Sequence, residues 1–208
     1  MRKYKAIIYD VDGTLLDTLK MNMVPLLQIL HEEGFTDFTY DTVLQYASYP
    51  GRKVLEELGV DNMDEVYQRW VRYVNEYSEE ASIFPGVIDL LKQVESMGYI
   101  QAVVSAKTYT QYRIDVVSKG LDSFMQERVL AEDTLKHKPD PEPLLLCCEH
   151  LGLSVDEVCY VGDAYSDYLA AQAADIDFIY AKWNGLHDER INAKVELNHP
   201  LELIESII

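Results

Sequence analysis

The segment AIIYDVDGTLLDT at residues 6–18 decides the fold, because an apolar run ends there in two acids separated by a single position. A continuous apolar run of this kind is typical of a parallel strand that is covered on both faces. Asp10 and Asp12 would lie together at the mouth of such a strand. Because charge beside a buried strand is costly unless it is paired, the two carboxylates predict a functional site.

Strand-like runs alternate with helical patterns from residue 84 onward. GVIDLLKQVESMG precedes YIQAVVS, and DPEPLLLCCEHLG precedes VCYVGD, with glycine where each helix should stop. This alternation is typical of βαβ units. The chain is therefore predicted to have an α/β fold, with a doubly wound, Rossmann-like parallel sheet as its core.

Residues 18–82 follow a different pattern. Apolar residues recur there at helical spacing in VPLLQILHEEG, TVLQYA, KVLEELG and MDEVYQRWVRYVNEY. We therefore expect residues 18–82 to form an α-helical domain that is inserted into a core made of residues 1–17 and 83–208.

Charge and cysteine content narrow the possible partners. The 208 residues include 18 basic and 36 acidic side chains, which gives a net charge of −18. Such a charge repels nucleic acid and anionic membranes, so neither is an expected partner. Three cysteines without CxxC spacing argue against a disulfide framework and indicate a cytoplasmic protein. The oligomeric state is left open by the sequence.

Polar residues follow three of the predicted strands. Asp10, Ser105 and Asp163 each end an apolar run, and the loop KHKPDPEP adds lysines before the next helix. In open parallel sheets, ligands bind beyond the carboxyl ends of the strands, so these groups should meet at one edge. A donor set of carboxylate oxygens favours Mg²⁺ over Zn²⁺. Because Mg²⁺ is usually shared with a substrate phosphate, the expected partner is a small phosphorylated metabolite.

Four segments carry a family resemblance in the order of the chain. They are DVDGT at 10–14, Ser105, KPDPEP at 138–143 and GDAYSD at 162–167. Together they resemble the motifs of the haloacid dehalogenase-like hydrolase superfamily, and the helical insert resembles the cap of its phosphoglycolate phosphatase-like branch. Taken alone, each segment also fits a structural role, such as an Asp-Gly turn or a helix cap.

The resemblance implies roles for individual residues. Asp10 would be the nucleophile that forms an aspartyl-phosphate, and Asp12 the general acid and base. Ser105 and Lys138 would be catalytic through their hold on the phosphoryl oxygens; Lys138 is preferred to Lys136 because Pro139 follows it, as in the family pattern. The implied ligands of Mg²⁺ are Asp10, Asp12 through its main-chain carbonyl, Asp163 and Asp167.

The expected substrate-binding residues come from both predicted domains. Arg52 and Lys53 follow Gly51 in the insert, where related caps present a recognition loop; a solvated helix start is the alternative reading. The full expected set is Gly13, Thr14, Arg52, Lys53, Ser105, Ala106 and Lys138.

The resemblance implies a magnesium-dependent phosphatase that acts on a small phosphorylated metabolite. Two alternatives stay open at this point. A sugar-phosphate mutase of the same superfamily needs the same pair of aspartates, and a noncatalytic phosphometabolite-binding module would need only the binding groups. Retention of Asp10 favours catalysis.

Overall fold

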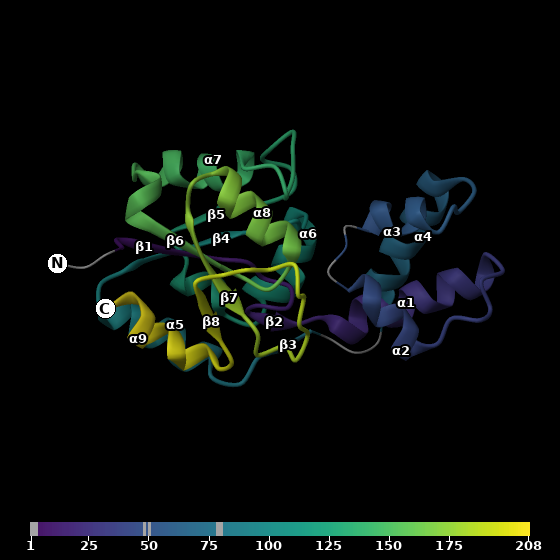
Figure 1. Cartoon of the computed structure of the whole chain (residues 1–208), viewed down its shortest axis with the longest axis horizontal. Coiled ribbons are helices and arrows are strands. Elements are labelled where there is room, and N and C mark those ends of the chain that lie inside the picture. The colour runs from purple at the N-terminus through teal and green to yellow at the C-terminus, as the bar shows by residue number, and fades with distance from the viewer. Residues whose placement is uncertain (1–3, 48, 50, 78–80) are drawn as a thin grey trace. The chain divides into compact units, whose positions relative to one another are not determined.

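The protein divides into two compact units. The computed structural model describes residues 4–47, 49, 51–77 and 81–208. One unit combines Met1–Asp17 with Ile83–Ile208, and we call it the core unit. The other is Thr18–Ser82, which we call the insert unit. Figure 1 shows the elements of both.

Six parallel strands form the sheet of the core unit. Their order is β5-β4-β1-β6-β7-β8. The chain leaves β1 toward β4 and β5, then returns to the other side of β1 at β6. The order therefore reverses beside β1, which is where open α/β sheets bind their ligands. The strands are β1 Ala6–Tyr9, β4 Ile100–Val104, β5 Glu127–Val129, β6 Val158–Gly162, β7 Asp177–Ala181 and β8 Val195–Leu197.

Helices cover both faces of this sheet. Figure 1 shows α7 and α8 on one face and α5 and α9 on the other. Ala6 and Ile8 of β1 pack in one buried cluster with Leu144 of α7 and Ala170 of α8. The remaining helical segments of the core unit are short. In chain order, the helical elements of the core unit, long and short, are α5 Val87–Ser96, α6 Tyr109–Tyr112, η2 Arg113–Val117, η3 Leu121–Phe124, α7 Glu142–Leu151, η4 Val155–Glu157, α8 Tyr165–Ala173, η5 Pro200–Glu202 and α9 Leu203–Ile207.

The insert unit is helical and has a core of its own. Leu26, Leu55 and Trp70 belong to its buried cluster, and the Trp70 indole donates to the Asn22 carbonyl at 3.2 Å. Its helices are α1 Leu19–Glu32, α2 Tyr40–Val43, η1 Leu44–Tyr46, α3 Gly51–Glu57 and α4 Met63–Glu76. Two short strands, β2 Leu16–Asp17 and β3 Ser82–Ile83, form a separate sheet. The predicted fold class, a doubly wound α/β core with a helical insert, is confirmed.

Within the described parts of the chain, no helix combines the length and the apolar character that crossing a bilayer requires.

A buried hydrogen bond between side chains of β1 and β4 gives a test of the packing. The Tyr9 hydroxyl donates to Gln101 Oε1 at 3.1 Å, and both side chains are fully buried. Gln101 Nε2 in turn donates to the Leu91 carbonyl at 3.0 Å. Tyr9→Phe should lower the free energy of unfolding by about 1–3 kcal/mol, because it leaves a buried acceptor without this donor. Urea denaturation measures the change.

The control for this prediction is Tyr109→Phe. The Tyr109 hydroxyl also donates to a side chain, Asp133 Oδ1 at 2.6 Å, but the residue is 45% exposed. Water can replace that contact, so its loss should change stability by less than about 0.5 kcal/mol. Equal losses in the two variants would contradict the assigned role of the buried Tyr9 hydroxyl.

Candidate active site

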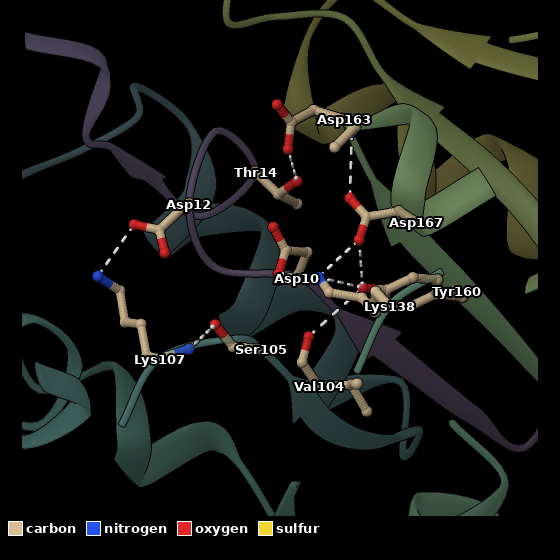
Figure 2. A network of polar contacts seen from close by, with 11 residues as sticks. Asp10, Asp12, Thr14, Val104, Ser105, Lys107, Lys138, Tyr160, Asp163 and Asp167 are labelled. Atoms are coloured by element: carbon tan, nitrogen blue, oxygen red, sulfur yellow. Dashed lines mark hydrogen bonds and ion pairs between the residues drawn. The ribbon is translucent and has the colours of Figure 1, made fainter. Parts of the chain in front are cut away.

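The carboxyl ends of β1, β4 and β6 bring the predicted polar residues to one edge of the sheet. Asp10 follows β1, Ser105 follows β4 and Asp163 follows β6. Strand pairing fixes this arrangement, since β1 pairs with β4 on one side and with β6 on the other. Figure 2 shows the resulting network. The polar residues therefore lie at the place where the strand order reverses.

Three aspartates form a compact acidic cluster at this edge. Asp10, Asp163 and Asp167 each place a carboxylate oxygen within 4.8 Å of the others. Burial, together with the neighbouring carboxylates, raises the pKa of Asp10 from its ordinary 3.8 to about 7. The pKa of Asp163 is raised for the same reasons. The ionised forms of Asp10 and Asp163 are therefore energetically disfavoured unless a cation lies close to them.

Lys138 reaches into this cluster from the loop before α7. Its Nζ lies 2.7 Å from Asp10 Oδ1 and 2.6 Å from Asp167 Oδ1. The Tyr160 hydroxyl donates to the same Asp167 oxygen at 2.9 Å. Burial alone would lower the pKa of Lys138, but the carboxylates of Asp10 and Asp167 outweigh it and raise that pKa. Lys138 is thus a fixed positive charge beside the proposed nucleophile.

Asp167 has its oxygens occupied by the protein. Besides Lys138 and Tyr160, which approach Oδ1, the main-chain N–H of Ala164 donates to Oδ2 at 3.1 Å and caps α8. A carboxylate with this set of donors is held in one orientation. Its contacts support a role in orienting Lys138 and the neighbouring carboxylates.

The acidic cluster fits a divalent cation. Three ionised carboxylates and the Lys138 ammonium leave two negative charges uncompensated between them. All the donors are oxygens, which suits Mg²⁺. Asp10 and Asp163 would hold the ion, with Asp167 nearby; the carboxylate of Asp12 lies outside this cluster and has a different partner. When bound, Mg²⁺ would offset repulsion between the carboxylates and a phosphoryl group.

The loop after β1 is fitted closely around Asp163. Gly13 has a φ of +83°, and a Cβ on it would lie 2.2 Å from Asp163 Oδ2, so only glycine fits. The Thr14 hydroxyl donates to Asp163 Oδ1 at 3.0 Å. Asn184 Nδ2 donates to Oδ2 at 2.7 Å, and the Trp183 indole donates to the Thr14 carbonyl at 2.8 Å. Gly13 and Thr14 therefore shape the cluster.

Asp12 points to a second lysine. Lys107 Nζ lies 2.9 Å from Asp12 Oδ1 and donates to Asp115 Oδ2 at 2.6 Å. Lys107 was not among the residues predicted from the sequence, although it lies only two residues after Ser105. Tyr160, Asn184 and Trp183 were not predicted to take part in the site either. These roles arise from contacts between distant segments, for which a single sequence carries no signal.

Ser105 and Ala106 begin the loop after β4. The Ser105 hydroxyl is buried and accepts from the Lys107 N–H at 3.3 Å, whereas Ala106 is exposed. Both residues line a cavity of about 10 Å³ together with Lys138. The structure thus brings these three predicted substrate-binding residues together.

Arg52 and Lys53 have partners within the insert unit. Arg52 is paired with Asp64 at 2.5 Å, and its guanidinium lies 4.8 Å from the centre of the Tyr67 ring. Lys53 lies 3.8 Å from Glu57 Oε1 and 5.1 Å from the centre of the Tyr49 ring. Their role in substrate binding stays a prediction.

The chain belongs to the haloacid dehalogenase-like hydrolases. The model of that family matches residues 7–181, which include all four predicted motifs. The family resemblance expected from the sequence is confirmed. The fold agrees, since a putative phosphoglycolate phosphatase from Lactobacillus plantarum superimposes with a TM-score of 0.90 at 24% identity, over 98% of this chain and 99% of that one.

Two curated relatives are enzymes that act on phosphate compounds. The pyrophosphatase PpaX of Bacillus velezensis is 26% identical and aligns over 88% of this chain and 85% of its own length. A phosphoglycolate phosphatase of Xanthomonas campestris is 28% identical over the same shares of the two chains. The predicted class of enzyme, a phosphoric monoester hydrolase, agrees with these relatives.

Removal of the Lys138 charge gives the first test of the site. Lys138→Met leaves Asp10 and Asp167 buried without their shared cation, which should lower the free energy of unfolding by about 3–5 kcal/mol at neutral pH. Lys136→Met is the matched control, because Lys136 is exposed and pairs only with Asp140 at 3.2 Å among the contacts described. Urea denaturation of both variants decides the matter. Equal stability would show that the Lys138 ion pairs do not hold the cluster.

The raised pKa values predict how a metal should affect stability. Because the folded-state pKa of Asp10 lies near 7, well above its ordinary 3.8, the metal-free protein should lose stability as pH rises across that interval. Mg²⁺ binds ionised carboxylates. Its stabilising effect should therefore be larger at pH 8 than at pH 5, reaching about 2.7 kcal/mol at a hundredfold excess over Kd.

Thermal denaturation with and without Mg²⁺ at the two pH values measures this effect. Asp163→Asn should lose most of the Mg²⁺-induced rise in Tm, whereas Asp156→Asn, an exposed residue in η4, should keep it. A rise that is the same at both pH values, or that survives Asp163→Asn, would argue against the metal site.

Proposed function

We propose that this protein is a magnesium-dependent phosphatase that hydrolyses a small phosphorylated metabolite through an aspartyl-phosphate on Asp10. The observation that carries the proposal is the separation of the two strand-end aspartates. Asp10 lies buried beside Lys138 and the other acids, whereas Asp12, two residues later, is paired with Lys107. Two carboxylates with different surroundings can perform different tasks.

The first step is transfer of the phosphoryl group to Asp10. A carboxylate oxygen of Asp10 attacks phosphorus, the bond from phosphorus to the leaving oxygen breaks, and Asp12 gives its proton to that oxygen. Lys138 balances charge on the equatorial phosphoryl oxygens, and the Ser105 hydroxyl donates to one of them. Asp10 and Ser105 would act from the ends of the neighbouring strands β1 and β4. Lys138 would act from the loop before α7.

The second step returns Asp10 to its free form. A water molecule attacks phosphorus, Asp12 accepts its proton, and the bond between phosphorus and the Asp10 oxygen breaks to release inorganic phosphate. Asp12 is thereby protonated for the next first step. Asp163, held by Thr14 and Asn184, would keep the charge next to Asp10 fixed during both steps.

The relatives support the class of substrate and leave its identity open. One is named for pyrophosphate and another for phosphoglycolate. We propose that this chain also acts on a small phosphate compound, with the insert unit as a cap that recognises the remainder of the substrate. The buried cysteines, Cys147, Cys148 and Cys159, fit the proposed cytoplasmic location.

The experiment measures phosphate release from a panel of small phosphorylated compounds, including phosphoglycolate, pyrophosphate and sugar phosphates. Release should require Mg²⁺, stop with a chelator and fall at least about 10³-fold in Asp10→Asn, because the amide is a poor nucleophile. Asp156→Asn serves as the control, because Asp156 is exposed in η4 and belongs to none of the four motifs.

Three outcomes would count against the proposal. Full activity in Asp10→Asn would exclude an aspartyl-phosphate on that residue. Activity unaffected by chelator would exclude the metal requirement. Interconversion of sugar phosphates without phosphate release would point to a mutase, and binding without any turnover would point to a noncatalytic module.

A further inference from the structure

Main-chain contacts fix Lys107 in the loop after β4. Its carbonyl accepts from the Ala131 N–H at 3.0 Å, beyond the end of β5, and its own N–H donates to Ser105 Oγ at 3.3 Å. The segment that carries the proposed phosphoryl-binding Ser105 thus also carries this lysine. Figure 2 shows the side chain extending from that segment toward Asp12.

The ammonium of Lys107 joins two carboxylates of unequal exposure. The side chains of Lys107 and Asp115 are only 6% and 7% exposed, whereas that of Asp12 is 34% exposed. Asp115 holds the ammonium through a hydrogen bond of 2.6 Å, and Asp12 Oδ1 lies 2.9 Å away as an ion pair. The buried end of this triad is therefore an anchor, and its accessible end is Asp12.

Asp115 lies in η2, a π-helical segment that continues directly from α6. Single π-helical turns are rare and often occur at functional sites. Here the turn includes Asp115, whose carboxylate points to Lys107. Ion pairing to Asp115 alone would satisfy a purely structural lysine, and buried ion pairs contribute little net stability. The additional contact with Asp12 therefore needs another explanation.

We infer that Lys107, anchored by Asp115, is a positioning residue that fixes the direction of the Asp12 carboxylate for proton transfer. The ion pair with Lys107 keeps the Asp12 carboxylate next to the acidic cluster but outside it. Lys138 does the corresponding task for Asp10, with Asp167 as its anchor. The inference rests on the proposed function, because it assigns Lys107 a task only if Asp12 exchanges protons with the substrate and water.

The choice of leaving group separates this role from a structural one. An alkyl alkoxide leaves poorly, so an alkyl phosphate depends on the proton from Asp12. p-Nitrophenolate is a stable anion and leaves without that proton. A misdirected Asp12 should therefore slow transfer from alkyl phosphates much more than transfer from p-nitrophenyl phosphate. General damage to the fold would slow both alike.

The experiment compares kcat/KM of Lys107→Met on p-nitrophenyl phosphate and on the best alkyl phosphate of the panel. This parameter reports steps up to release of the alcohol, so hydrolysis of the aspartyl-phosphate does not mask the difference. Because general acid catalysis contributes about 10²–10⁴-fold, the alkyl reaction should fall about 10²-fold and the aryl reaction less than about tenfold. Lys107→Arg keeps the cation and should recover part of the alkyl rate.

Two further variants guard against loss of the fold. Lys107→Met combined with Asp115→Leu removes the buried charge that the single substitution would strand, and it should show the same preference for the aryl ester. Asp12→Asn provides the reference for complete loss of the proton donor. Adding Lys107→Met to Asp12→Asn should leave the alkyl-to-aryl ratio unchanged, because Lys107 acts through Asp12.

The outcomes separate this inference from the proposed function. Equal loss on both esters, or a further change of the ratio in the Asp12→Asn background, would overturn the role of Lys107 while leaving the phosphatase intact. Absence of turnover of every compound by the unmodified protein would overturn the proposed function, and the role of Lys107 with it. A selective loss on the alkyl ester that Lys107→Arg partly restores would support both.

Discussion

The ion pairs of Lys138 are the interaction on which the rest of the site depends. Its ammonium lies within 2.7 Å of both Asp10 and Asp167, and all three side chains are less than 10% exposed. Without it, the end of β1 would hold a buried carboxylate close to two others, a strongly unfavourable arrangement. The lysine makes a dense group of acids compatible with folding. It also leaves them short of positive charge, which is the condition for taking up a divalent ion.

Close packing imposes a second constraint at the same place. A Cβ on Gly13 would overlap the Asp163 carboxylate, and a Cβ on Gly162 would lie 2.7 Å from Asp167 Oδ2. Both glycines therefore allow main chain and carboxylate to approach where any other residue would push them apart. Two factors thus set the positions of the acids. They are the positive charge of Lys138 and the absence of a side chain at Gly13 and Gly162. The motif DVDGT combines the proposed nucleophile with the glycine that its neighbours require.

The sequence predicted the parts of the fold that have a strong local pattern. The central strands β1, β4 and β6 are mostly apolar runs of four or five residues, and each leads into a polar residue of the site. The edge strands β5 and β8 have three residues each, too few to show a periodicity. Their pairing depends on the neighbouring strand, which makes it a tertiary effect.

The candidate site could be predicted in its motif residues and not in its supporting contacts. Asp10 and Asp163 follow recognisable strands, whereas Asn184 reaches Asp163 from a loop after β7 that no motif marks. Asp175 illustrates the same limit: it has a φ of +58°, a left-handed conformation that no motif of the sequence marks. Aspartate tolerates that conformation better than most side chains.

The two lysines explain how acids two residues apart can differ in chemistry. Alternation along an extended chain would give Asp10 and Asp12 similar directions, but the turn after β1 separates them, and each then meets its own cation. Lys138 comes from the loop before α7 and Lys107 from the loop after β4. A different segment of the chain therefore supplies the cation beside each aspartate. A carboxylate pair without such partners would share charge and protons between its members. Here the fold separates them, which agrees with the proposed roles, in which one acid bonds to phosphorus while the other transfers protons.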